Sequence, residues 1–355
     1  MPEEALVPLP AQPPGVPWPS PDPDGWPRGY TPPSLTALVD DLIADTERYG
    51  TTYAALVIRG GRLLTEYYGG ELPHFDAPPE PVTPTTPLLS WSMAKSVLHA
   101  GIGVLVGQGR IDIHVPANVP AWHEDANDPR VAITLDHLLA MRDGLDFAED
   151  YVDAGVSDVI EMLFGRGKDD VAAYAEARPL AHEPNSTFNY SSGTSNIVSA
   201  IAGRTCGESA AFVDLLQREV FEPIGVTSAD PRRDEAGTFI GSSYFYATAR
   251  DFARFGLLYL RDGNWDGRRL LPEGWVDHGR RQRSVDAEGF GYGAHWWVVD
   301  DAQGSFRASG YEGQSILVCP GLDLLAVRLG RSSEEQHPAL REWRAAVVDW
   351  AQQED

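Results

Sequence analysis

The chain of 355 residues has little lysine, little cysteine and no long apolar run. Lysine occurs only twice, as Lys95 and Lys168, although the chain holds 28 lysines and arginines together. The two cysteines, Cys206 and Cys319, are too few for a disulfide framework, so we interpret them as small buried residues in a reducing compartment. No apolar stretch is long enough to span a bilayer, which argues against a membrane-spanning protein.

Basic charge is scarce beside acidic charge. The chain carries 52 Asp and Glu residues, and its formal net charge is −24. This balance argues against nucleic acid or an anionic membrane as a partner, and we interpret it as a solvated acidic surface. A high-salt interior and a GC-rich genome would both produce such a composition. Because the N-terminal residues lack the basic region and apolar stretch of a signal peptide, we expect a cytoplasmic protein.

The first part of the chain is rich in proline and has no helical period. Residues 1–33 are therefore expected to form an arm that runs extended over the surface, with Trp18, Trp26 and Tyr30 pinning it to the body. The whole chain is 43% hydrophobic and is long enough to bury a large core.

The order of elements predicts an α+β fold. Ser34 is expected to cap an amphipathic helix that ends at Gly50, and Gly60-Gly61 joins two β-rich runs in a hairpin. Residues 134–221 are mainly helical. Further strands are expected at 292–299, 306–309, 315–318 and 324–328, followed by a closing helix at 338–351. We therefore predict an antiparallel sheet flanked by N- and C-terminal helices, with an inserted mainly helical lobe.

This pattern predicts a division of the chain as well. The sheet domain would comprise residues 34–115 and 236–355, and the helical lobe residues 116–235. Trp296 and Trp297 are neighbours in a predicted strand, so one ring should face the core and the other a cleft or the surface.

A serine precedes one of the two lysines by three positions, in the segment SWSMAKS at 90–96. Residues three apart share a helix face, so the Ser92 hydroxyl and the Lys95 amine would lie side by side. Lysine, unlike arginine, can lose its proton at usable cost, and burial in the apolar surroundings of this segment would favour the neutral form. Residues 107–109, with two glycines, can end the helix. The pattern predicts a serine nucleophile with a lysine base.

The serine would lie at the amino end of this helix, where the serines can act as caps. Unpaired N–H groups and the helix dipole favour an alkoxide or an oxyanion at that position. The simpler alternative is an ordinary N-cap at Ser92 and a surface residue at Lys95, because Ser-x-x-Lys also occurs by chance.

The sequence lacks the motifs of other enzyme classes. The sequence contains no Gly-x-Ser-x-Gly elbow of the α/β-hydrolases and no His-Glu-x-x-His zinc motif. Gly101, Gly103 and Gly107 resemble a dinucleotide fingerprint poorly, because they lie inside the predicted helix, where we expect them to allow close packing. We therefore expect no metal and no other cofactor.

Two further segments, FNYSSGTSN at 188–196 and ASGYEGQ at 308–314, follow the serine motif. With them the chain, from about Ser34 to its C-terminus, resembles the penicillin-recognising serine hydrolases, the superfamily of the serine β-lactamases. The nearer likeness is to the branch of carboxylesterases and 6-aminohexanoate-dimer (nylon-oligomer) hydrolases. The resemblance implies a serine β-lactamase-like form of the fold predicted above.

The resemblance assigns roles to particular residues. Tyr190 would hydrogen-bond Ser92 and Lys95 and pass the proton to the leaving group, with its pKa lowered by the neighbouring ammonium. The backbone N–H groups of Ser92 and Tyr311 would form the oxyanion hole. Further substrate-binding residues would be Ser192, Ser309, Gly310 and Gln314. The alternatives are that Tyr190 is a core aromatic and that the glycines at 308–314 mark a turn.

The segment EDYVD at 149–153 resembles the mobile loop that carries a tyrosine over the bound amide in the nylon-oligomer hydrolases. Tyr151 would then hold the leaving nitrogen, and closure of the loop would exclude water.

Two positions depart from the β-lactamases and transpeptidases. Ser192 replaces the third-position asparagine of the tyrosine motif, and Ala308 replaces the lysine that binds the substrate carboxylate. Arg307 is adjacent but would point to the opposite side of the strand. We therefore expect substrates without an obligatory carboxylate beside the scissile bond, and feeble or absent β-lactam turnover.

The combined prediction is a cofactor-free serine hydrolase that acts on small esters or linear amides, with 6-aminohexanoate-type amides as the specific expectation. A carboxylesterase without amidase activity and a penicillin-binding or sensor protein with little turnover remain alternatives. The expected partner is the small-molecule substrate, and a homodimer is left open.

Overall fold

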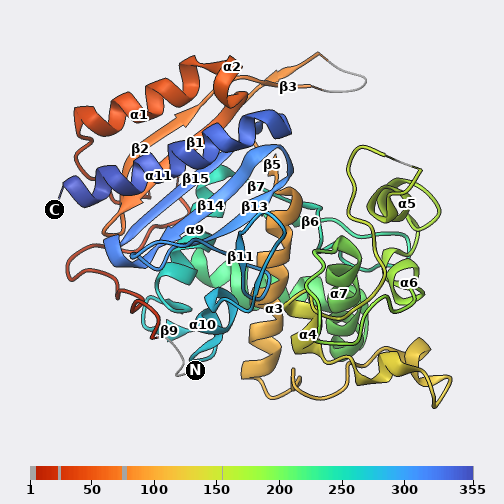
Figure 1. Cartoon of the computed structure of the whole chain (residues 1–355). Helices are drawn as coiled ribbons and strands as arrows, with labels where there is room; N and C mark the ends of the chain where they lie inside the picture. Colours follow the sequence, from red (N-terminus) through yellow and green to blue (C-terminus); the bar gives the residue numbers. More distant parts are fainter. Residues whose placement is uncertain (1–4, 23–24, 74–77, 154, 355) are drawn as a thin grey trace.

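The computed structural model describes residues 5–22, 25–73, 78–153 and 155–354, and within them one central antiparallel sheet organises the molecule (Figure 1). Its strand order is β10-β11-β12-β13-β14-β15-β1-β2. The α+β class and the antiparallel sheet are confirmed. In that order, the strands are Ser284–Val285, Gly291–Tyr292, Trp297–Val298, Phe306–Gly310, Gln314–Cys319, Leu324–Arg331, Thr51–Arg59 and Arg62–Tyr68.

The central strands are buried on both faces because side chains alternate between two hydrophobic cores. In β1, Leu56 faces the larger core, whereas Ala55 and Val57 face a smaller one. Three helices cover the smaller core on one side of the sheet: α1 (Pro33–Ala44), α2 (Thr46–Tyr49) and α11 (His337–Gln353). In Figure 1, α1 and α11 run side by side across this face.

The opposite face of the sheet packs on α9 (Ala249–Leu260), and α3 (Ala94–Gly107) lies between the sheet and the helical part of the molecule (Figure 1). Helices α3 and α7 are in contact. The helical part agrees with the prediction for residues 134–221. Its helices are α4 (Leu135–Leu139), α5 (Asp158–Phe164), α6 (Val171–Glu176), α7 (Ser192–Cys206) and α8 (Ser209–Leu216), which continues into a π-turn at Gln217–Phe221.

Short elements complete the fold. Helix α10 spans Trp275–Arg280. The small strand pairings are β3 (Glu71–Leu72) with β4 (Glu80–Pro81), β5 (Leu88–Leu89) and β6 (Asp230–Pro231) with β7 (Phe245–Ala247), and β8 (Asn264–Trp265) with β9 (Arg268–Arg269).

Several local predictions are confirmed by particular contacts. Gly60 and Gly61 both have positive φ, 57° and 71°, as a tight hairpin between β1 and β2 requires. In α3, a Cβ on Gly101 would lie 2.6 Å from Phe212, and one on Gly103 would lie 2.3 Å from Trp275, so these glycines permit close packing. Trp296 is buried in the core, whereas Trp297 lines a cavity.

The start of the first predicted helix and its continuity are both wrong. Pro32, not Ser34, occupies the N-cap position of α1, and the Ser34 hydroxyl donates to Glu354 at 3.1 Å instead. The predicted single helix also breaks at Asp45, whose side chain caps α2.

The proline-rich arm is held to the body, although not by all three predicted aromatics. Trp26 is 2% exposed, and Trp18 packs on Trp265 with 4.7 Å between ring centroids. Tyr30 is 78% exposed and pins nothing, so that prediction is wrong. Buried arginines also bind the arm: Arg261 donates to Gln12 at 2.9 Å, and Arg280 donates to the backbone of the arm.

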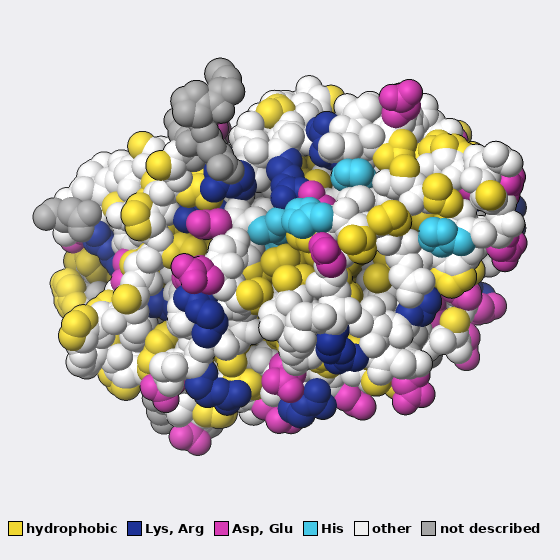
Figure 2. Space-filling model, turned by 90° about the horizontal axis from the view of Figure 1, so that it is seen from below, with side chains coloured by type: hydrophobic (Ala, Val, Ile, Leu, Met, Phe, Trp, Pro, Cys, Tyr) yellow, Lys and Arg dark blue, Asp and Glu magenta, His cyan; other side chains and the backbone are white. Residues whose placement is uncertain are grey.

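The face of the molecule in Figure 2 carries acidic and basic side chains interspersed with apolar ones. The net negative charge therefore does not form a continuous acidic region on this face. No helix among the described residues has the length and apolar character needed to cross a membrane.

Candidate active site

Ser92 lies on a 3₁₀ turn, Trp91–Met93, that leads from β5 directly into α3. Trp91 has a φ of 45°, unusual for a residue with a side chain, and the Ser90 N–H donates to the carbonyl of Phe245 at 2.8 Å. The expectation that serines cap the helix is wrong, because α3 begins at Ala94 with no side-chain cap. The hydroxyl of Ser92 therefore remains available to other groups.

Lys95 lies one turn later and is 2% exposed. Its Nζ donates to Ser92 Oγ at 3.1 Å, to Ser192 Oγ at 3.1 Å and to the carbonyl of Ser242 at 3.0 Å. Burial lowers the pKa of Lys95 to about 8, against an opposing effect of the Glu149 charge. Near neutral pH about a tenth of this amine is therefore neutral and can accept a proton, far more than at an unperturbed lysine.

Tyr190 precedes α7 and lies beside this pair, with the Lys95 Nζ 4.8 Å from the centroid of its ring. Burial, followed by the charge of Glu149, raises the pKa of Tyr190, while a hydrogen bond with Ser92 opposes them. The expected lowering of this pKa is therefore wrong. Since Lys95 loses its proton more readily than Tyr190, the phenol stays protonated when the amine is neutral.

Glu149 connects the lysine to the predicted loop tyrosine. Its carboxylate accepts hydrogen bonds from the Ser192 N–H at 2.7 Å, from Ser192 Oγ at 2.5 Å and from the Tyr151 hydroxyl at 2.5 Å. The ring of Tyr151 stacks on Tyr311 with 5.1 Å between centroids. Burial raises the pKa of Tyr151, while a hydrogen bond with Ser92 again opposes it. Loop 149–153 thus reaches the serine itself.

Strand β13 ends against the serine turn because of one glycine. A Cβ on Gly310 would lie 2.2 Å from the carbonyl oxygen of Ser90 and 3.1 Å from Trp91. Only a residue without a side chain allows this approach. Tyr311 follows at once, and its ring meets that of Trp91 edge-on at 5.6 Å. The backbone predicted to complete the oxyanion hole is held close to the serine turn.

A cavity of about 600 Å³ opens over the serine. The predicted residues that line it are Ser92, Tyr151, Tyr190, Ser309, Gly310, Tyr311 and Gln314. Ser192 is buried behind the cavity wall, between Lys95 and Glu149. Gln314 reaches the cavity, but its amide is engaged with the backbone of Tyr311 and Gly330.

Arg307 also lines the cavity, and its Nε donates to Ser309 Oγ at 2.9 Å. Ala308 is buried in the core on the other side of the strand. The predicted alternation is confirmed, but the inference that it removes Arg307 from the site is wrong, because the cavity lies on the Arg307 side.

Sequence reasoning missed two groups of cavity residues. Glu149 lies in the loop motif two positions before Tyr151, and this carboxylate beside a predicted site tyrosine is the signal that marks it in the sequence. Arg341 and Arg344, from α11, also line the cavity, and no motif marks them. Within the described ranges, no group of three or more His, Cys, Asp or Glu side chains is arranged to hold a metal ion.

A model of the beta-lactamase family matches residues 35–349, and the chain therefore belongs to that family. The 6-aminohexanoate-dimer hydrolase of Paenarthrobacter ureafaciens is 28% identical over 313 residues, covering 82% of this chain and 75% of that protein. The predicted membership in the penicillin-recognising serine hydrolases is confirmed, and with it the prediction of a serine hydrolase.

Solved structures show the same fold. One is a Bacillus anthracis protein provisionally named as a 6-aminohexanoate-dimer hydrolase. It superposes with a TM-score of 0.73 at 22% identity, and the superposition covers 94% of this chain and 89% of that one. EstCE1, a hydrolase with promiscuous acyltransferase activity, gives a TM-score of 0.67 at 18% identity and covers 88% and 98%.

Proposed function

We propose that the protein hydrolyses small esters and linear amides through an acyl-enzyme on Ser92. The observation that carries this proposal is the 3.1 Å contact between the Lys95 amine and the Ser92 hydroxyl, at a lysine that is 2% exposed. A buried amine with a pKa of about 8 is a usable base, whereas a solvated one would be protonated.

Acylation begins with the neutral amine. Ser92 Oγ forms a bond to the substrate carbonyl carbon, and its proton moves to Lys95 Nζ, which becomes an ammonium. The carbonyl oxygen becomes an oxyanion, for which the N–H groups of Ser92 and Tyr311 are the proposed donors. The contact of Gly310 with the backbone of Ser90 supports this pairing, because it keeps the end of β13 beside the serine turn.

Loss of the leaving group requires a proton. As the bond from the carbonyl carbon to the leaving nitrogen or oxygen breaks, Tyr190 donates its phenolic proton to that atom and recovers one from the Lys95 ammonium. Lys95 is then neutral again. A water molecule attacks the acyl carbon with the same base, which releases the acid and restores the Ser92 hydroxyl.

The substrate is inferred from the loop. Tyr151 lies against both Ser92 and Tyr311, where its hydroxyl can reach a leaving nitrogen. This position supports linear amides of the 6-aminohexanoate type, and the similarity to the Paenarthrobacter hydrolase points the same way. With Ala308 in place of the lysine of the β-lactamases, we propose that β-lactams are poor substrates.

The test compares p-nitrophenyl butanoate, 6-aminohexanoate dimer and nitrocefin with the wild type, Ser92→Ala and Tyr190→Phe. Ser92→Ala should lower turnover of the first two substrates by about a thousandfold or more. Tyr190→Phe should slow the amide more than the ester, because p-nitrophenolate leaves without a proton. Ester hydrolysis that survives in Ser92→Ala would refute the acyl-enzyme, and rapid serine-dependent cleavage of nitrocefin would reverse the order of substrates.

A further inference from the structure

Three arginines meet at one part of the active-site cavity. Arg307 comes from β13, and Arg341 and Arg344 come from one face of α11. The guanidinium carbons of Arg307 and Arg341 lie 5.8 and 5.1 Å from the centroid of the same ring, that of Phe290. The arginines therefore form one cluster, which we call the arginine cluster.

Among the described residues, no member of the arginine cluster makes an ion pair with a carboxylate. Several more deeply buried arginines do have one: Arg254 contacts Asp251 at 2.7 Å, and Arg261 contacts Asp323 at 2.5 Å. The buried Arg328 instead donates to the backbone carbonyls of Glu312 and Tyr49. Neighbouring cations without counter-ions are costly when they are removed from water. The chain has 52 acidic residues, so carboxylates that could pair with these arginines are abundant elsewhere in the sequence. Three neighbouring arginines without such a partner therefore indicate a site for an anion from outside the chain.

The acids that face the cluster are engaged with other groups or exposed. Asp286, Glu288 and Glu334 also line the cavity. The same three arginines border a neighbouring cavity with the exposed Asp300 and Asp349 and with Asp301, whose carboxylate accepts from the N–H groups of Gln303 and Ser305. The Asp286 carboxylate accepts hydrogen bonds from the backbone N–H groups of Glu288 and Phe290 in its own loop. Burial lowers the pKa of Arg307 to about 10, with Arg341 acting in the same direction and Asp286 against it. The charge of Arg341 thus affects Arg307 more than the charge of Asp286 does.

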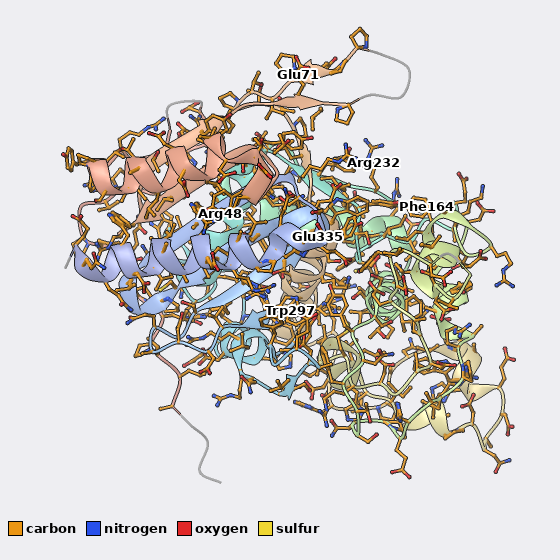
Figure 3. All side chains as sticks on the ribbon, turned by 45° about the horizontal axis from the view of Figure 1, so that its top comes forward. Arg48, Glu71, Phe164, Arg232, Trp297 and Glu335 are labelled. Atoms are coloured by element: carbon orange, nitrogen blue, oxygen red, sulfur yellow. The ribbon has the colours of Figure 1, made fainter. Side chains whose placement is uncertain are left out.

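Aromatic rings connect the arginine cluster to the catalytic groups. Trp297 lies 5.4 Å from Tyr190 between ring centroids, and its ring is 6.0 Å from the guanidinium carbon of Arg307. Trp297 and Glu335, which lies just before α11, are both toward the middle of the molecule in Figure 3. Along β13, Arg307 is three residues before Gly310, about 10 Å at the usual strand rise. The rings of Tyr190, Trp297 and Phe290 give this part of the lining an apolar surface that suits a methylene chain, and the Ser309 hydroxyl beside it is engaged with Arg307.

We propose that the arginine cluster binds a carboxylate of the substrate, separated by a chain of several methylenes from the scissile carbonyl. The proposal rests on the proposed acyl-enzyme and adds the class of substrate: linear esters or amides with a free terminal carboxylate. Arginine suits this role because its planar guanidinium donates two parallel hydrogen bonds to a carboxylate. A carboxylate at this distance is compatible with Ala308, which removes only the site directly beside the scissile bond.

The experiment uses two matched substrate pairs, which place the charge on either side of the scissile bond. The first pair is p-nitrophenyl hydrogen adipate and p-nitrophenyl hexanoate. The second is N-butanoyl-6-aminohexanoate and N-butanoyl-hexylamine. For at least one pair, the wild type should have the higher kcat/KM on the charged member. Arg341→Gln should reduce that preference about tenfold or more through KM, and Arg341→Lys should reduce it less.

Arg48→Gln is the matched control, because Arg48 is an exposed arginine that pairs with Glu342 of α11 outside the cavity. This variant should keep the wild-type preference. Arg307→Lys provides a second change in the cluster and should also lower the preference. The proposal is overturned if the wild type does not prefer the charged member of either pair, or if Arg341→Gln and Arg48→Gln behave alike. Failure of the acyl-enzyme proposal has a different result: hydrolysis of p-nitrophenyl hexanoate would then not depend on Ser92.

Discussion

At the scale of single residues, the chemistry depends on the protonation of Lys95. Burial lowers the pKa of Lys95 to about 8, and the neutral form is the base. Below that pKa, kcat/KM for a neutral ester should therefore rise about tenfold per pH unit, and above it the profile should level. The measurement is hydrolysis of p-nitrophenyl butanoate from about pH 6 to about pH 9.5, corrected for the spontaneous rate.

Lys95→Arg is the matched control for this profile, since a guanidinium keeps its charge throughout the range. It should be inactive at every pH. A wild-type profile that is flat across the range would contradict a base with the lowered pKa.

Glu149 also affects the protonation of Lys95. Its charge raises the pKa of Lys95 against the effect of burial. Glu149→Gln removes the charge while keeping an oxygen that can accept the hydrogen bond from the Ser192 N–H, so the pKa of Lys95 should fall further. The rising limb of the pH profile should then move to lower pH. Glu161→Gln, at a half-exposed acid that pairs with Arg166 away from the cavity, should leave the limb in place. A move to higher pH in Glu149→Gln would refute this role.

At the scale of elements, the approach of β13 to the serine turn depends on Gly310. In Gly310→Ala, the new Cβ would lie 2.2 Å from the backbone oxygen of Ser90, so the end of the strand must move. Displacing the Tyr311 N–H should lower kcat by about a hundredfold or more, with a smaller effect on KM. The control is Gly107→Ala at the end of α3, where a Cβ would only make an ordinary 3.5 Å contact with Pro272. Equal kcat values for the two variants would contradict the oxyanion role of this segment.

The elements near Ser92 were predictable because their signals are local. The three-residue spacing of Ser92 and Lys95 and the paired glycines of the hairpin each fix geometry within a few residues. The start of α1 was not predictable from Ser34, because its hydroxyl has an alternative partner, Glu354, at the other end of the chain.

The position of Arg307 shows the limit of such reasoning. Alternation along β13 predicted correctly that Arg307 and Ala308 face opposite sides. It could not predict which side holds the cavity, because that depends on where α11 packs, and α11 begins thirty positions later in the chain. The prediction that the pKa of Tyr190 is lowered was wrong for a similar reason. Its burial comes from segments distant in sequence, including Trp297 and Tyr292.

At the scale of the whole molecule, the proline-rich arm joins parts that are distant in sequence. It contributes Trp18 to a contact with Trp265, and its backbone accepts hydrogen bonds from Arg254 and Arg280. These arginines are buried, and without the arm their donors would lose partners in a dry environment. The arm therefore belongs to the folded body, although its described residues before Pro33 form no helix.

Trp26 tests this conclusion, because it is 2% exposed and its ring lies 5.6 Å from the guanidinium carbon of Arg254. Trp26→Ala should lower the free energy of unfolding by about 3 to 5 kcal/mol, since it leaves a cavity under the arm and uncovers a buried arginine. Tyr30→Ala, in the same arm at 78% exposure, should change it by less than about 0.5 kcal/mol. Denaturant unfolding of both variants provides the comparison. Because neither residue lines the active-site cavity, kcat for p-nitrophenyl butanoate should remain at the wild-type value in both while they are folded. An unfolding free energy of Trp26→Ala equal to that of Tyr30→Ala would mean that the arm rests on the surface without stabilising it.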